Sequence, residues 1–392
     1  MVAIETKNHA RRSPSGSYRW LTCPGSLRLE AQFPYTTSAA AEEGTLAHAL
    51  CELKLKQYFY PNELRKSVYD AEVKRLKENP LWDKEMEGYT DVYADYIKQI
   101  ALSQPSMPYV SIEKQIDVGN YIPECYGTAD CILISGSTLH VFDFKYGKSP
   151  DGRVEAEGNT QMQLYALGAY DTYKLLYPIT QFVLHIIQPR LPDGISSWGL
   201  PLQELMNFAA YAAERAKLTE ASNAEFHPDA KACRYCRAGA MCRARAEANT
   251  ACYQETETDP ALLAPEEIGV YLVAGEDIDR WLKTVQAYAL AQCLAGKEIP
   301  GWKAVEGRGS REWIDMDKAF STLQASGVPE AVLYERKPLT LAQVEKAVGK
   351  KVFQNTVGNL VTKKPGKPTL VIETDKRPAI TNVISAAEAF KN

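Results

Sequence analysis

Two consecutive runs decide the fold of this chain: YGTADCILIS at 126–135 and TLHVFDFKYG at 138–147. Both are short and rich in β-forming residues, and the Gly-Ser pair between them is a turn signal. Residues two apart in a strand share a face, so Asp143 and Lys145 point to the same side, with Phe144 between them. Such a pair in an apolar segment either neutralises itself at the surface or takes part in chemistry.

The neighbouring segments extend this pattern into an α/β core. The run YVSIEKQIDV at 109–118 is a third β-rich segment, so residues 109–147 predict an antiparallel meander. A helical pattern follows at 158–177. The continuous apolar run QFVLHIIQPR at 181–190 is typical of a strand that is buried on both faces, and 202–221 is a second helical pattern.

The chain before and after this core has a different character. Residues 41–59 and 82–103 repeat apolar positions at helical spacing after a loop start, and 260–296 predicts one or two helices. Residues 300–392 resemble a smaller α+β segment with Pro-rich and Lys-rich turns. We predict three parts: an N-terminal loop and helical segment at 1–108, a core at 109–245 that ends in a cysteine cluster, and a C-terminal helical and α+β accessory region at 246–392.

Composition limits the class of protein. The chain has 392 residues, of which 45% are hydrophobic and 24% charged, which is ordinary for globular domains. Its apolar runs are short and its N-terminus lacks the apolar stretch of a signal peptide, so we expect a soluble, intracellular protein. The nine cysteines are an odd number, which favours thiols or metal ligands in a reducing compartment. The net charge of -4 gives no global signature of nucleic-acid binding.

The acidic residues of the meander predict a metal site. Asp130 lies in the strand before Asp143, and adjacent antiparallel strands can bring the two carboxylates close together. Such carboxylates repel each other unless a cation lies between them, and oxygen ligands of this kind suit Mg²⁺ or Mn²⁺. A lysine beside the ion can orient or deprotonate an attacking water and offset charge in the transition state. This combination is the equipment of a phosphodiester hydrolase.

The order of these motifs resembles a known nuclease superfamily. Asp130, then Asp143-Phe144-Lys145, then Gln161-Met162-Gln163-Leu164-Tyr165 in the following helix are similar to the PD-(D/E)XK pattern. His48 in EEGTLAHAL matches the metal-binding histidine of the RecB-like branch, which also carries a Gln-x-x-x-Tyr motif. The resemblance to RecB-like and AddB-like nuclease domains, and to the nuclease of CRISPR adaptation, covers about residues 10–245. The whole chain is similar to a family of phage-encoded proteins assigned to this superfamily.

The resemblance implies a restriction-endonuclease-like core, a mixed central sheet flanked by helices, and a Mg²⁺- or Mn²⁺-dependent deoxyribonuclease. It further implies an exonuclease that acts on DNA ends in phage or bacterial recombination or replication. It implies that the metal is bound by His48, Asp130, Asp143 and the Phe144 carbonyl. It implies that the catalytic residues are Lys145, Asp143 and Asp130. Gln161 and Tyr165 would complete the catalytic set and would face the DNA or brace the site. Glu113 on the first strand, and more weakly Glu43, are candidates for an outer metal shell. The sequence departs from the pattern in one respect, because no Pro precedes Asp130.

Each of these residues also has an ordinary structural interpretation. Asp143 and Lys145 alone could form a surface pair on an edge strand. His48 alone is typical of a packed structural histidine, and Gln161 and Tyr165 share a helix face and could pair at the rim of the core. The joint order of the motifs favours the nuclease.

The cysteines predict a second centre. The run CRYCRAGAMC at 233–242 spaces three cysteines as C-x2-C-x5-C, and a fourth ligand has to come from elsewhere. The proposed ligands are Cys23, Cys233, Cys236 and Cys242, with Cys252 as an alternative fourth. The same spacing occurs in RecB-like nucleases with an iron-sulfur cluster, so the resemblance implies a structural [4Fe-4S] cluster. A structural Zn²⁺ is the alternative. The remaining apolar-context cysteines, which we expect in the core, are Cys51, Cys125, Cys131 and Cys293.

An acidic chain that cuts DNA has to present basic residues locally. The basic residues available are Arg11, Arg12, Arg19 and Arg28 near the N-terminus, Arg234, Arg237, Arg243 and Arg245 around the cysteines, and the tail at 340–392, which has nine Lys or Arg against four Asp or Glu. The aromatic residues Tyr18, Trp20 and Tyr146 either stack on unpaired bases or belong to the core.

Two other classes of function stay open from the sequence. One is a catalytically silent DNA-binding or assembly protein that keeps the nuclease fold, and the other is an RNA-directed or redox-sensing iron-sulfur protein. For the nuclease we expect DNA ends, single strands included, as the main partner, with a phage single-strand-binding or recombination protein as a second. We expect no membrane, and the sequence leaves oligomerisation open. The expected location is the cytoplasm of a bacterial host, with the gene on a phage or prophage.

Overall fold

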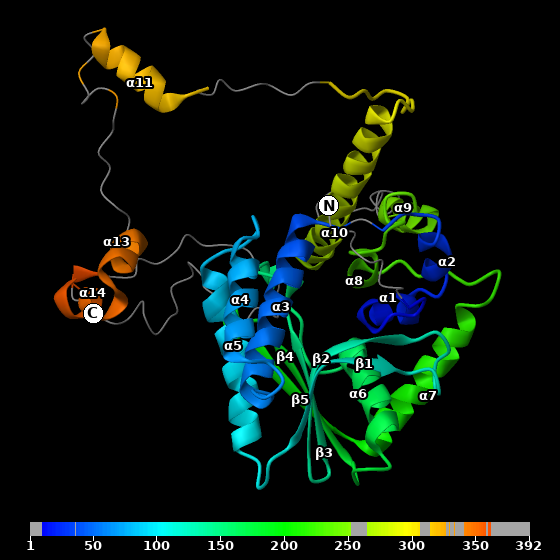
Figure 1. Cartoon of the computed structure of the whole chain (residues 1–392). Coiled ribbons are helices and arrows are strands. Elements are labelled where there is room, and N and C mark those ends of the chain that lie inside the picture. Colours follow the sequence, from blue (N-terminus) through cyan, green and yellow to red (C-terminus); the bar gives the residue numbers. More distant parts are fainter. Residues whose placement is uncertain are drawn as a thin grey trace, which may run out of the picture. The chain divides into compact units, whose positions relative to one another are not determined.

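The structure, a computed structural model, describes residues 10–35, 37–251, 265–305, 314–326, 329, 333, 341–357 and 360–361 (Figure 1). The chain divides after Val305 into two compact units. The first unit contains the sheet and all the site residues predicted above. Within the described residues, no helix is long and apolar enough to span a membrane.

The first unit is an α/β fold with a five-stranded mixed sheet. The strands are β1 (Tyr109–Asp117), β2 (Tyr126–Ser135), β3 (Thr138–Phe144), β4 (Gln181–Ile187) and β5 (Ile195–Pro201), in the order β1-β2-β3-β4-β5. All neighbouring pairs are antiparallel except β3 and β4, which are parallel. The predicted meander and the buried strand at 181–190 are therefore confirmed, whereas β5 was not predicted.

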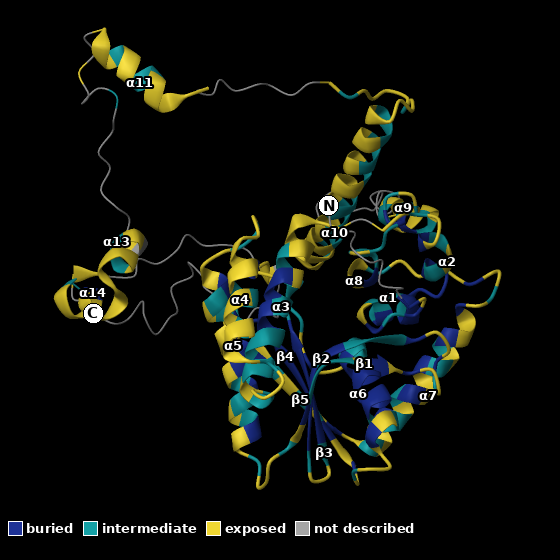
Figure 2. Cartoon of the chain, viewed as in Figure 1, coloured by how far each residue is buried: buried dark blue, intermediate teal, exposed yellow. Residues whose placement is uncertain are grey.

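Helices cover both faces of the sheet (Figure 1). The helices α3 (Ala39–Phe59), α4 (Lys66–Lys77) and α5 (Glu85–Leu102) lie on one face, and α6 (Thr160–Tyr173) and α7 (Leu202–Leu218) lie on the other. Figure 2 shows the sheet as the buried centre between these layers. Alternate residues of β3 belong to the two cores: Val141 lies in the core that contains Leu164 of α6, and Phe142 lies in the core that contains Tyr93 of α5.

Helix α6 is held close to the sheet at a glycine. A Cβ on Gly168 would lie 2.3 Å from the Ile116 side chain and 2.7 Å from the Asp117 carbonyl oxygen, so only glycine fits there. The helix begins with an N-cap, because the Asn159 side chain accepts a hydrogen bond from the Met162 amide at 3.1 Å. These contacts fix the start of α6, whose first turn carries the predicted site residue Gln161.

The expected N-terminal loop contains short helices that pack against the core and the cysteine region. These elements are η1 (Pro14–Gly16), α1 (Ser17–Thr22) and α2 (Ser26–Glu30), whereas the cysteine region contains α8 (Ala230–Cys233) and α9 (Arg243–Ala251), and a further short turn is η2 (Pro150–Gly152). Arg12 is fully buried and donates to the Thr219 hydroxyl at 3.0 Å and to the Pro123 carbonyl at 2.8 Å. The N-terminal segment is thereby joined to the loop before β2 and to the end of α7.

Beyond the core, α10 (Pro265–Leu294) is one helix of the first unit. The described residues of the second unit form the helices α11 (Met316–Ala325), α13 (Leu341–Val348) and α14 (Lys350–Val357). Residues 362–392, including most of the Lys-rich stretch VTKKPGKPTLVIETDKRPAI, lie outside the described residues, as does Cys252. The three-part division at 108 and 245 stays a prediction.

Candidate metal and catalytic site

The two aspartates of the meander lie opposite each other across β2 and β3. The ladder pairs Cys131 with Phe142, and one step further it brings Asp130 level with Asp143. Asp130 is held by the backbone of the neighbouring strand, because the Phe144 amide donates to its Oδ2 at 2.8 Å. The sheet register therefore places both aspartates at the same end of the β2–β3 pair.

A histidine and a third carboxylate complete a group with metal-ligand spacing. His48 on α3 brings its Nδ1 to 3.4 Å from Asp130 Oδ1. Ligand atoms of His48, Glu113 and Asp130 all lie within 4.8 Å of one another, the one such group of three within the described residues. An imidazole and two carboxylates are suitable ligands for a divalent metal.

Glu113 reaches this position through an unusual backbone conformation. Its φ is +49°, in the left-handed region that non-glycine residues rarely adopt. The ladder between β1 and β2 pairs Ile112 with Cys131 and Lys114 with Ala129, so it omits Glu113 and the facing Asp130. The irregular pairing and the positive φ occur together at the acidic residue. From sequence Glu113 was a weaker outer-shell candidate, whereas the geometry puts it among the closest ligands.

Lys145 and Gln161 form a network around Asp143. The ammonium of Lys145 lies 2.8 Å from Asp143 Oδ2 and donates to Gln161 Oε1 at 3.2 Å. The amide of Gln161, in the first turn of α6, donates to Asp143 Oδ1 at 3.0 Å and to the Tyr165 hydroxyl at 3.5 Å. The structure thus brings four side chains together: Asp143 of β3, Lys145 just after β3, and Gln161 and Tyr165 of α6.

The charges of the site are not balanced internally. Burial disfavours the charged forms of Asp130 and His48, but their mutual attraction outweighs it, so the Asp130 pKa is lowered and the His48 pKa is raised. The pKa of Asp143 is raised, because burial and the Asp130 charge outweigh the attraction of Lys145. The pKa of Lys145 is raised because its attraction to Asp143 exceeds the effect of burial.

Asp143 Oδ2 is a buried oxygen whose partner is the Lys145 ammonium. The two atoms lie 2.8 Å apart, and no other partner of this oxygen lies in the described part of the chain. One ammonium does not balance the carboxylates of Asp143, Asp130 and Glu113, and buried excess negative charge is unfavourable unless a further cation contacts it. A divalent ion therefore fits this donor set, with Asp143 beside the group formed by His48, Glu113 and Asp130.

Phe144, Glu43 and Tyr146 near the site each have contacts that bear on the roles expected of them. The Phe144 amide contacts Asp130, whereas metal binding by the Phe144 carbonyl stays a prediction. Glu43 is paired with Arg190 at 3.2 Å, so it serves an ion pair and not the metal shell. Tyr146 is only 5% exposed and lies under the Arg190 guanidinium, 4.4 Å from its ring centroid, so it does not stack on DNA bases.

The four cysteines proposed as ligands line one small cavity. Cys23 follows α1, Cys233 ends α8, and Cys236 and Cys242 lie between α8 and α9. Burial raises the pKa of Cys23 and Cys233, and that of Cys236 to about 12. In the described region no three of these sulfur atoms come within 4.8 Å of one another. Four sulfurs around one zinc ion at 2.3 Å would be roughly 3.8 Å apart, so these sulfur atoms are not at zinc spacing in this structure.

Two polar atoms at this cavity have no hydrogen-bond partner among the described residues. They are Ser26 Oγ and Arg245 Nε, and both residues line the cavity and are at most 3% exposed. Unpaired buried donors are rare in folded proteins and indicate an acceptor at the site. Metal-bound sulfur is an acceptor of this kind. The remaining cysteines differ from one another: Cys51, Cys125 and Cys131 are buried as expected, whereas Cys293 is only half-buried.

Several arginines proposed for DNA binding have structural roles instead. Arg12 and Arg245 are each 2% exposed. Arg19 and Arg237 both contact the buried Glu30, through Arg19 Nε at 2.9 Å and the Arg237 amide at 2.8 Å. Trp20 is 1% exposed and belongs to the core, in agreement with the second of its two interpretations.

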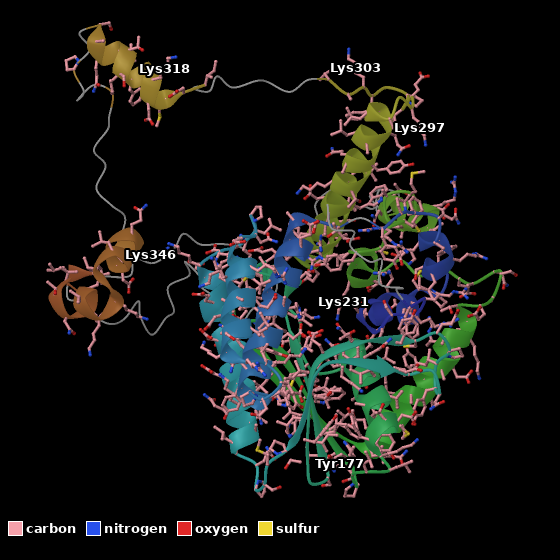
Figure 3. All side chains as sticks on the ribbon, in the orientation of Figure 1. Tyr177, Lys231, Lys297, Lys303, Lys318 and Lys346 are labelled. Atoms are coloured by element: carbon pink, nitrogen blue, oxygen red, sulfur yellow. The ribbon has the colours of Figure 1, made fainter. Side chains whose placement is uncertain are left out.

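Some basic residues of the cysteine region do lie at the surface. Arg243 is exposed, and Lys231 of α8 lies beside α1, with its Nζ 4.3 Å from the centroid of the half-buried Tyr18 ring (Figure 3). Tyr235 is 72% exposed, with the Arg234 guanidinium 5.9 Å from its ring centroid. Any DNA contact of this region therefore has to come from such residues, and not from the buried arginines.

Comparison with known proteins identifies the family. A family profile described as "Protein of unknown function (DUF2800)" matches residues 9–378. The chain belongs to this family. The match spans the sheet, both candidate centres and most of the second unit, so the family comprises the whole architecture described above and not the core alone.

Three solved structures are similar over about half of this chain. The crystal structure of SSO0001 is 17% identical, covers 50% of this chain and 85% of that chain, and has a TM-score of 0.24. The alkaline exonuclease LHK-Exo from Laribacter hongkongensis is 14% identical, covers 44% of this chain and 88% of that chain, and has a TM-score of 0.21. LHK-Exo in complex with dAMP is 13% identical, covers 46% of this chain and 94% of that chain, and has a TM-score of 0.22. These TM-scores are too low to support a conclusion about fold or function. The functional conclusion rests on the site itself.

Proposed function

We propose that this protein is a metal-dependent DNA nuclease of the PD-(D/E)XK type, in its RecB-like branch. The observation that carries the proposal is the cluster at the edge of β1, β2 and β3. There the three carboxylates of Asp130, Asp143 and Glu113 meet only one histidine and one lysine. Negative charge in excess of positive charge at a buried site is the requirement for binding a divalent cation.

Magnesium or manganese fits this donor set. The proposed ligands are Asp130, Asp143, His48 and Glu113, with the Phe144 carbonyl as a further candidate. We assign Glu113 as a direct ligand, and not to the outer shell expected from sequence, because its ligand atom lies close to those of His48 and Asp130. A bound ion would supply Lewis-acid polarisation of the scissile phosphate and a water of lowered pKa.

The side chains of the chain itself have distinct tasks. Lys145, held as an ammonium by Asp143 and Gln161, stabilises the negative charge that develops on the phosphate oxygens. Gln161 fixes both partners through its two amide atoms, and Tyr165 supports Gln161 from one helical turn further on. Because the contacts of Lys145 favour its charged form, we assign it charge stabilisation and orientation of the water in preference to proton abstraction.

The finer assignment follows from the sequence resemblance. We propose an exonuclease that acts on DNA ends in phage or bacterial recombination or replication, with DNA as its partner. The surface supply of positive charge supports a local DNA path in an acidic protein, and Lys231, Arg243 and the Arg234–Tyr235 pair are its described members. Exposed tyrosine beside arginine suits unpaired bases, which are present at DNA ends.

We further propose that Cys23, Cys233, Cys236 and Cys242 hold a structural metal centre. Support comes from the shared cavity and from the two unpaired buried polar atoms beside it. We choose a [4Fe-4S] cluster over zinc because of the sequence resemblance. It would tie the segment before the core to the segment after it. Iron, zinc and acid-labile sulfide analysis of anaerobically purified protein tests this assignment, and zinc without sulfide would refute the cluster.

The test of the nuclease is degradation of end-labelled linear DNA, single- and double-stranded, with Mg²⁺, Mn²⁺ or EDTA. We expect metal-dependent degradation by the wild type and its loss in Lys145→Met, with equal folding by circular dichroism. Lys148→Met is the matched control, because Lys148 is exposed three residues away, and should retain activity. Folded wild-type protein with a loaded cysteine site and no cleavage would favour a catalytically silent DNA-binding protein instead.

A further inference from the structure

Arg245 contacts two different parts of the molecule with one side chain. It lies in the first turn of α9, and its guanidinium is 3% exposed. Nη1 donates to the Cys233 carbonyl at 3.0 Å, and Nη2 donates to Asp277 of α10 at 3.2 Å. Its third donor, Nε, is buried and has no partner among the described residues.

Arg245 is one of the residues that line the cysteine cavity. Arg245 lines this cavity together with the four cysteines and Ser26, whose hydroxyl is the second unpaired buried polar atom. Gly239 leaves room for the guanidinium, because a Cβ there would lie 3.2 Å from Nη1 and 3.0 Å from the Cys236 carbonyl oxygen. A charged donor held this tightly with one unused N–H requires an acceptor in the cavity.

Helix α10 depends on few contacts. None of its residues is buried, although it runs for 30 residues. Asp277 is half-buried, with a side chain that is 18% exposed, and its partner is the buried Arg245. A helix with so little buried surface is held weakly, so one charge-assisted hydrogen bond to a fixed guanidinium is a large share of its attachment.

We propose that Arg245 links the occupant of the four-cysteine site to helix α10. This inference rests on the metal centre in the proposed function, but not on whether that centre is iron-sulfur or zinc. Nε donates to a sulfur atom of the loaded centre, and this fixes the guanidinium so that Nη2 holds Asp277. Arg245 is therefore a positioning residue, and the centre restrains α10 in addition to joining the ends of the core.

The test is hydrogen exchange by mass spectrometry on the full chain, with metal and sulfide content measured on the same samples. In the wild type, removal of the centre should speed exchange of α10 peptides around Asp277 by about tenfold, the equivalent of one charge-assisted hydrogen bond. Peptides of β3 serve as the internal reference and should not change.

Two variants separate the link from general unfolding of the cysteine region. Asp277→Asn should keep the full metal content yet exchange in α10 as fast as metal-free wild type, with little further increase on metal removal. Arg245→Lys should show the same fast exchange and retain the centre less well during chelation. Arg243→Lys, an exposed arginine two residues away, is the matched control and should show the α10 exchange and the metal retention of wild type.

The outcomes are distinguishable from failure of the proposed function. Wild-type α10 exchange that is unchanged on metal removal, or slow α10 exchange in fully loaded Asp277→Asn, would overturn the link while leaving the metal centre intact. Wild-type protein without any metal at the cysteines would overturn the centre and the link together. DNA cleavage is measured separately and reports only on the carboxylate site.

Discussion

Two buried polar clusters lie on the same strand, β3, and behave in opposite ways. Near its start, His140 Nδ1 lies 3.0 Å from His185 Nε2 of β4, and His185 Nδ1 lies 3.1 Å from the Tyr96 hydroxyl. Phe142 stacks on His185 with ring centroids 4.4 Å apart and planes 9° apart. At the other end of β3, Asp143 and Lys145 form the candidate catalytic site.

The difference is charge. Burial lowers the pKa of His140 to about 4, and burial together with the neighbouring His140 lowers that of His185 to about 3, so both imidazoles are neutral at pH 7. As neutral groups the two histidines and Tyr96 can satisfy one another with hydrogen bonds. Asp143 instead shares one ammonium, that of Lys145, with a second carboxylate, Asp130. A polar cluster that satisfies itself contributes to stability, whereas one that does not is built to receive a ligand.

The largest effect should come from neutralising the carboxylate at the catalytic end of the strand. Asp143→Asn removes a metal ligand and the partner of Lys145, so DNA cleavage should fall by about 10²–10⁴-fold. His140→Asn, on the same strand, should leave cleavage at pH 8 within about twofold of wild type. Initial rates on labelled linear DNA measure both. Equal losses in the two variants would show that the distinction between the clusters is wrong.

The histidine end of the strand should control acid stability. Both folded pKa values lie below that of an unfolded histidine, about 6.5, so the unfolded chain binds more protons as the pH falls. Stability should therefore be fully present above pH 6.5 and be lost below it, by about 1.4 kcal/mol per pH unit for each histidine. Urea unfolding of wild type between pH 7.5 and 4.5 measures this slope.

His185→Gln separates this effect from the titration of other groups. The variant lacks one of the two depressed pKa values, so its stability should depend less steeply on pH by the contribution of one histidine. Identical slopes for wild type and variant would place the acid sensitivity elsewhere.

A smaller effect should expose the conformational strain of the metal site. Glu113→Gly permits φ = +49° without strain, so the metal-free protein should gain about 1 kcal/mol in free energy of unfolding. The same variant should lose metal affinity, because a carboxylate ligand is gone. Urea unfolding in EDTA and metal titration measure the two effects. A variant that is both less stable and unchanged in metal affinity would remove Glu113 from the site.

Sequence patterns predicted the elements that are amphipathic or continuously apolar. The meander at 109–147, the strand at 181–190 and the helices α6 and α7 lie where periodicity put them. The edge strand β5 was missed because ISSWGLP contains Ser and Gly and buries only Leu200. Its strand character depends on pairing with β4, which is a tertiary effect.

The site was predictable as a set of motifs but not as a geometry. Asp130, Asp143, Lys145 and Gln161 meet because strand register and a helix N-terminus are local properties that a motif retains. Glu113 could not be ranked correctly, because a positive φ at a glutamate leaves no sequence signal. The burial of Arg12 and Arg245 was equally hidden, since each depends on partners far away in the sequence or in another helix.

The most direct test of the account is calorimetric titration of metal-free protein with Mn²⁺. We predict binding by the wild type, its loss in the double variant Asp130→Asn/Asp143→Asn, and its retention in His140→Asn/His185→Gln. The prediction follows from unbalanced charge at one end of β3 and satisfied neutral groups at the other. Equal Mn²⁺ binding by wild type and the aspartate double variant would contradict the assignment of the metal site.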